Sequence, residues 1–231
     1  MKIIKKILFK IARSSTSSLF IGFIFEYLAG ILPLDRIFLD ENVIVFKHPV
    51  PFWKTHYLAV PRRKIFSFLH LDLSMPKTKE IIVAILSSLQ TVAKANNLVT
   101  YRIIVNGGDY QDVPQLHFHL CDDIIIGGGE SRVLSHVKSS NENLRDKYQS
   151  ALLYKHTNPN RHVHYMLVSN IGIPSFNEVL FFNQTHKDAI IDILLLAQKT
   201  INENKLTAYS LIIEDSIEYH QPELRVHLVS A

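Results

Sequence analysis

The chain repeats itself at a spacing of 108 residues, and this repeat limits its possible folds more than any other feature. The stretch "YRIIVNGGDYQDVPQLHFHL" from Tyr101 aligns with "YSLIIEDSIEYHQPELRVHL" from Tyr209. Between Lys47 and Leu120, 22 of the 74 pairs aligned at this spacing are identical, and the alignment has no gap. Self-similarity of this length at a fixed spacing is typical of a duplicated structural unit. We therefore predict two copies of one fold.

Within the first copy, apolar patterns predict short strands around one helix. The strand patterns are "NVIVFKH" from residue 42, "HYLAVP" from His56, "TYRIIVNGG" from Thr100, and residues 115–121. The helix pattern covers residues 76–97, with Pro76 near its first turn and isoleucines and leucines along one face. The Asn-Gly pair in "VNGG" predicts a tight turn at the end of the third strand.

Composition predicts where the copies begin and end. The stretch "KSSNENLRDK" is mainly polar, which is typical of a linker. We therefore predict an N-terminal segment over residues 1–34, a first copy over 35–137, a linker over 138–147 and a second copy over 148–231.

The positive charge is concentrated in the N-terminal segment. The net charge is +4, but the first 25 residues contain five lysines and arginines and no acidic residue, so the rest is nearly neutral. A near-neutral body argues against a nucleic-acid-binding protein.

Residues 1–13 show the pattern of a basic amphipathic helix. The apolar run that follows the Ser-rich spacer contains Glu26 and is shorter than the roughly 20 residues of a membrane span. Three interpretations stay open: a packed helix, a peripheral membrane anchor, or an organellar transit peptide. The default location is cytoplasmic, with membrane-associated or organellar location as the alternative.

The stretch "QLHFHL" carries the most informative chemistry. Polar and apolar side chains alternate along it: Gln115, His117 and His119 with Leu116, Phe118 and Leu120. Residues two apart in a strand point to the same face. The pattern therefore predicts that the amide and the two imidazoles project together while the apolar residues pack on the other side.

With its context, this stretch resembles the signature of the histidine triad (HIT) superfamily, in which a Gln and a Val precede three alternating histidines. "FKHPVPFWKTHYLAVPRR" is similar to the strand–loop–strand of that family, and "VNGG" to its Asn-containing turn. The resemblance covers roughly residues 35–125 and extends weakly, through the repeat, to the C-terminus. It implies an α+β fold with an antiparallel sheet and packed helices. The two copies would form an internal pseudo-dimer, as in the two-copy uridylyltransferase and phosphorylase branches.

The resemblance also implies nucleotide hydrolase or nucleotidyltransferase activity with a covalent histidine intermediate. His117 would be the nucleophile, with Gln115 at the first triad position and His119 at the third. His56 would support the nucleophile from the neighbouring strand. The phosphate- or substrate-contacting positions would be Asn106, Gln111 and His48. This scheme uses neither a metal nor another cofactor, and its partner is a nucleotide or phosphorylated small molecule.

Departures from the family pattern leave alternatives open. Gln115 cannot carry a proton or a charge, and His48 stands where relatives carry an acidic ribose-binding residue. The second copy has Arg225 at the nucleophile position, which predicts a structural half and either a monomer or a dimer. One alternative is a non-catalytic nucleotide-binding module, possibly at a membrane surface. Another is a zinc site at His117 and His119 with His56 as third ligand. A further group of histidines, at 156, 162 and 164, is interpreted as a remnant.

Overall fold

A computed structural model describes residues 34–123, 141–157, 159, 161–216 and 223–231. The chain divides into two compact units, Met1–Leu98 with Gln111–Ser131, and Val99–Tyr110 with Arg132–Ala231. The interpretations of the N-terminal segment fall on residues outside the described ranges, apart from Leu34. Among the helices of the described residues, none combines the length and the apolar character needed to cross a membrane.

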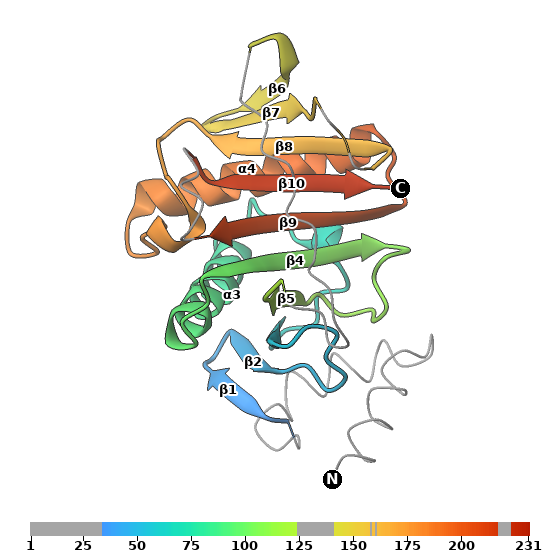
Figure 1. Ribbon diagram of the computed structural model, residues 1–231. Helices are drawn as coiled ribbons and strands as arrows, with labels where there is room; N and C mark the ends of the chain where they lie inside the picture. Colours follow the sequence, from blue (N-terminus) through green and yellow to red (C-terminus); the bar gives the residue numbers. More distant parts are fainter. Residues whose placement is uncertain (1–33, 124–140, 158, 160, 217–222) are drawn as a thin grey trace. The chain divides into compact units, whose positions relative to one another are not determined.

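The first unit holds a four-stranded antiparallel arrangement and one long helix (Figure 1). Its elements are β1 (Arg36–Leu39), β2 (Val43–Lys47), β3 (His56–Pro61), the 3-10 helix η2 (Phe68–His70), α3 (Pro76–Ala95) and β5 (Phe118–Cys121). The strands follow the order β1-β2-β3-β5, and α3 contacts β2, β3 and β5. The predicted strands at residues 42–48 and 56–61 and the helix from Pro76 are thereby confirmed.

The helix forms and packs as its sequence requires. Pro76 occupies the first turn, where the missing N–H has no intrahelical partner in any case. The face predicted to be apolar is buried, at Ile81, Ile82, Ile85, Leu86 and Leu89. Burial of this stripe against the strands supplies most of the helix's stability.

The second unit contains six antiparallel strands in the order β4-β9-β10-β8-β7-β6. Its elements are β4 (Thr100–Gly108), η3 (Asn141–Asn143), β6 (Leu144–Tyr148), β7 (Ala151–Lys155), β8 (Val163–Ser169), η4 (Phe176–Glu178), α4 (Gln184–Glu203), β9 (Ala208–Ser216) and β10 (Arg225–Ser230). The helix α4 contacts β6, β7 and β8 (Figure 1). Asn183 caps it by accepting hydrogen bonds from the backbone N–H groups of Thr185 and His186.

One predicted boundary differs from the strand bounds. Residues 144–147 were expected in a linker, but they begin β6, which pairs with β7. The strand β4 groups with the second unit because it pairs with β9 along its whole length. The bounds of the two copies therefore stay a prediction. Gly107 is required in β4, since a Cβ at this position would collide with the ring of Tyr209.

The same elements and pairings recur 108 residues apart. The starts of η2 and η4, of α3 and α4, and of β4 and β9 all differ by this spacing. Strand register follows it as well: Leu58 pairs with His119, and Met166 pairs with His227. The internal pseudo-dimer stays a prediction, because the positions of the two units relative to one another are not determined.

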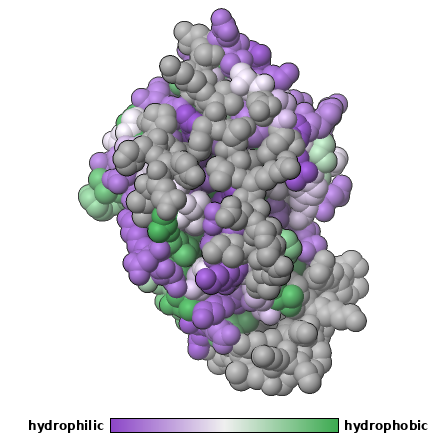
Figure 2. Space-filling model, viewed as in Figure 1, coloured by the Kyte–Doolittle hydropathy of each residue, from purple (hydrophilic) through white to green (hydrophobic). Residues whose placement is uncertain are grey.

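On the face seen in Figure 2, the described surface is mainly hydrophilic with scattered hydrophobic spots.

Candidate active site

His117 lies directly before β5 and has a ring nitrogen available as a nucleophile. Its Nδ1 lies 2.8 Å from the backbone oxygen of Gln115. A carbonyl oxygen only accepts hydrogen bonds, so Nδ1 carries the hydrogen and the lone pair of the neutral ring is on Nε2. Burial lowers the pKa of His117, which favours this neutral form near pH 7.

His119 presents a buried N–H donor beside that ring. The backbone N–H of Phe52 donates to Nδ1 of His56 over 3.3 Å, so the hydrogen of His56 is on Nε2. His56 Nε2 lies 2.9 Å from Nδ1 of His119, which must accept it. The hydrogen of neutral His119 is therefore on Nε2, and this atom is buried without a hydrogen-bond partner. Burial, together with the neighbouring histidines, holds the pKa of His119 well below its usual range.

The role expected for His56 is therefore corrected. It was expected to support His117, but its hydrogen bond goes to His119. The physical reason is the pairing of β3 with β5, in which Leu58 is opposite His119 and His56 is opposite Cys121. The orientation of His117 comes instead from the backbone carbonyl two residues before it.

His48 joins this group from the end of β2. Its ring stacks on that of His56, with centroids 4.1 Å apart and an interplanar angle of 5°. Its Nδ1 accepts a hydrogen bond from the backbone N–H of Val50. Nitrogen atoms of His48, His56 and His119 lie within 4.8 Å of one another, so these three could hold a metal ion. The zinc alternative proposed from the sequence therefore involves His48 in place of His117.

Trp53 is a candidate that the sequence did not identify as a donor. Its ring stands edge-on to that of His56, with centroids 4.9 Å apart. Its Nε1 is buried without a hydrogen-bond partner. A buried indole N–H usually finds an acceptor, so this atom is available to a bound ligand. The only sequence signal is its place in the loop between β2 and β3, which contains His48 and leads to His56.

Gln115 was expected to project beside the histidines and Gln111 to contact phosphate, but the amide N–H groups of both bond to backbone oxygens. The Nε2 of Gln115 donates to the backbone oxygens of Pro61 and Arg63, and the Nε2 of Gln111 donates to those of Phe66 and Val113. Both hydrogens of each amide are thereby used. The reason for Gln115 is that β5 begins only at Phe118. The alternation expected over residues 115–121 therefore does not start at Gln115.

Asn106 belongs to β4 and thus to the other compact unit. The hydroxyl of Ser210 donates to its Oδ1 over 2.6 Å. A phosphate-contacting role for Asn106 therefore stays a prediction. In contrast, the apolar half of the motif is as expected, because Leu116, Phe118 and Leu120 are all buried.

The neutral histidines make the first unit sensitive to acid. Burial lowers the pKa of His56 to about 3 and that of His48 to about 4, against 6.5 when exposed. Between these values the unfolded chain binds more protons than the folded one, so stability rises with pH. The folded state therefore keeps its full stability with respect to these two histidines above about pH 6.5, and it loses stability as the pH falls toward 4. We expect each neutral histidine to contribute a slope of at most about 1.4 kcal/mol per pH unit in this window.

Urea unfolding at pH 7, 6 and 5, followed by tryptophan fluorescence, measures this effect. Trp53 is the single tryptophan and contacts His56, so the signal reports on the first unit. His56→Gln should flatten the slope, whereas His70→Gln, at an exposed position of the same unit, should not. An unchanged slope in His56→Gln would contradict the assignment of a neutral, buried His56.

Comparisons with known proteins agree with this fold. Residues 31–122 match the model of the HIT domain. An uncharacterized HIT-like protein of Chlamydia trachomatis serovar D is 32% identical over 114 residues, which is 46% of this chain and 92% of that protein. Two solved structures share the fold at low identity. A GalT-like protein from Arabidopsis thaliana has a TM-score of 0.55 at 9% identity, over 86% of this chain and 79% of that one. A uridylyltransferase has a TM-score of 0.55 at 10% identity, over 82% and 74% of the two chains.

Proposed function

This chain belongs to the HIT family, and on that premise we propose that it hydrolyses a nucleotide, or transfers its nucleotidyl group, through a covalent bond between phosphorus and Nε2 of His117. The substrate is a nucleoside phosphate ester, anhydride or phosphoramidate. Support comes from the HIT relationship and from the name of one protein of similar fold, a uridylyltransferase.

The observation that carries the proposal is the fixed tautomer of His117. Its Nδ1–H is held by the Gln115 carbonyl at 2.8 Å, so Nε2 has a lone pair without needing a base to remove a proton. The unpartnered Nε2–H of His119 belongs to a ring whose centroid is 4.9 Å from that of His117. Donors fixed beside a reacting phosphorus stabilise the charge on its oxygens.

The proposed reaction has two steps. In the first, Nε2 of His117 forms a bond to phosphorus, and the leaving group departs with the electron pair of the broken bond. The phosphorylated ring then carries a positive charge, which the carbonyl of Gln115 stabilises through Nδ1–H. In the second, the oxygen of water or of another acceptor attacks phosphorus, its proton goes to solvent, and the N–P electron pair returns to Nε2. The His119 N–H donates a hydrogen bond to phosphoryl oxygen in both steps and keeps its proton.

Intact-protein mass after brief mixing with activated nucleotides tests this proposal. The panel contains adenosine phosphoramidate, diadenosine polyphosphates and nucleoside-diphosphate sugars, with acid avoided during handling because phosphorylated histidine is acid-labile. We expect a mass increase of one nucleotidyl group with at least one compound. Peptide mapping should place the added group on the peptide that contains His117.

Two results would count against the proposal. One is an added group that maps to a peptide without His117. The other is turnover without any adduct, even when the reaction is quenched within a single turnover. His70→Ala, which removes an exposed histidine of the same unit, provides the control and should form the adduct normally.

A second candidate function is nucleotide binding without turnover. It is favoured by the amides of Gln111 and Gln115, whose N–H groups are used by backbone carbonyls. Such a site has fewer donors for phosphate than the family pattern implies. Saturable binding of a nucleotide, with neither adduct nor product, would support this function over catalysis.

A further inference from the structure

The second unit contains a buried group of three histidines that the proposed reaction does not use. His156 follows β7, His164 lies in β8 and His227 lies in β10. Their exposed fractions are only 2%, 3% and 1%, and one nitrogen of each lies within 4.8 Å of one nitrogen of the others. We propose that these three side chains bind a divalent transition-metal ion of the zinc class. The site is independent of the proposed catalytic function.

The backbone of the second unit holds the three rings together before any ion binds. The N–H of His156 donates to the carbonyl of His164 over 3.0 Å, which fixes the end of β7 against β8. In the pairing of β8 with β10, His227 is opposite Met166, two residues from His164 along the strand. The rings of His156 and His164 stack with centroids 3.8 Å apart. A bound ion therefore requires only rotations of side chains, because the strands are already paired.

One ring nitrogen in this group has no hydrogen-bond partner, and this points to a ligand. Nε2 of His164 lies 2.9 Å from Nδ1 of His227, but Nδ1 of His164 is buried without a partner. A buried polar atom in this state is costly. The equivalent atom of the first unit, Nδ1 of His56, accepts the backbone N–H of Phe52. Coordination of a metal by the lone pair of His164 would remove this cost.

The chemistry of the donors selects the metal. Neutral imidazole is a good ligand for zinc, copper and nickel and a poor one for magnesium and calcium. Three histidines with a fourth position for water form a common tetrahedral zinc set, with nitrogen–metal distances of about 2.0–2.1 Å. The nearby Arg225 cannot act as a ligand or as a nucleophile, and it pairs with Glu223 over 3.5 Å. The ion would thus bind where the second copy lacks a nucleophile.

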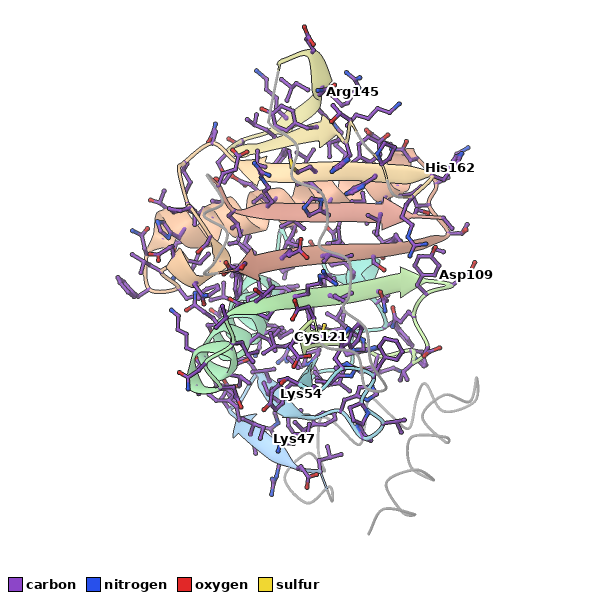
Figure 3. The ribbon with its side chains drawn as sticks, in the orientation of Figure 1. Lys47, Lys54, Asp109, Cys121, Arg145 and His162 are labelled. Carbon is purple, nitrogen blue, oxygen red and sulfur yellow. The ribbon has the colours of Figure 1, made fainter. Side chains whose placement is uncertain are left out.

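Metal titration of the full chain tests the proposal. The protein is stripped with a chelator, dialysed, and titrated with Zn²⁺ by calorimetry and with Co²⁺ by visible absorption, which reports tetrahedral coordination. We expect a site that persists in His48→Ala, which disrupts the equivalent group of the first unit. The same site should weaken by about 100-fold or more in His156→Ala and in His227→Ala. His162→Ala is the matched control and should bind normally, because His162 is exposed at the outer edge of the unit (Figure 3).

The structure also corrects the sequence interpretation, which grouped His162 with His156 and His164, because the third histidine of the group is His227. Failure of Zn²⁺ to bind at micromolar concentration would overturn the proposal, as would binding that is lost in His48→Ala but kept in His156→Ala. Circular dichroism checks that each variant is folded. If a variant unfolds, X-ray absorption of zinc-loaded His48→Ala decides: scattering from three imidazoles supports the proposal, and its absence overturns it.

Discussion

Replacing His117 with alanine is expected to lower kcat/KM by about 10⁴-fold or more toward whichever nucleotide the wild type turns over. The variant keeps the donor of His119 and the loop that carries Trp53, so binding should change far less than the rate. The reason is that alanine removes the nitrogen whose lone pair is fixed by the bond of Nδ1 to the Gln115 carbonyl. Steady-state kinetics and equilibrium binding of the same nucleotide separate the two effects.

Exogenous imidazole provides the sharper part of this experiment. Alanine leaves space where the ring was, so added imidazole can enter and attack phosphorus from solution. Partial recovery of turnover that depends on imidazole concentration is expected for His117→Ala, because the missing group is a nucleophile. His70→Ala should keep full activity and show no response to imidazole. If His117→Ala retained wild-type kcat/KM, covalent catalysis through this residue would be excluded.

The sequence predicted those parts of the fold that depend on periodicity and local chemistry. The apolar face of α3 and the buried Leu116, Phe118 and Leu120 follow from side-chain spacing alone. Spacing does not determine where a strand begins, and this is why Gln115 was misplaced. Pro114 precedes it, and the N–H of Gln115 bonds to the carbonyl of Val113, so the chain is still turning at this residue.

Partners of buried polar groups were the least predictable part of the site. The bond from His56 to His119 depends on the register of β3 against β5, which no local pattern encodes. The third member of the histidine group in the second unit is His227, and the repeat had already aligned it with His119. The repeat spacing was therefore a better guide to that group than proximity along the sequence, which favoured His162.

Two ion pairs of the second unit have the same length but differ in burial, and we expect burial to set how much each contributes to stability. Arg102 Nε lies 2.7 Å from Glu214 Oε1, and both side chains are less than a tenth exposed. Lys199 Nζ lies 2.7 Å from Asp146 Oδ2, with exposed fractions of 45% and 29%. Glu214→Ala is expected to lower the free energy of unfolding by about 3–5 kcal/mol, because it leaves the guanidinium of Arg102 buried without its carboxylate. Asp146→Ala should cost only about 0–1 kcal/mol, since water solvates the released ammonium.

Urea unfolding followed by far-ultraviolet circular dichroism measures both variants, because the single tryptophan lies in the first unit. The double variant Arg102→Met with Glu214→Leu serves as the control for the cause. It removes both charges and fills similar volume, so it should recover most of the loss if an uncompensated buried charge is responsible. Equal costs for Glu214→Ala and Asp146→Ala would mean that burial of the first pair does not set its energy. A double variant as unstable as Glu214→Ala would instead assign the cost to packing between β4 and β9, whose paired residues include Arg102 and Glu214.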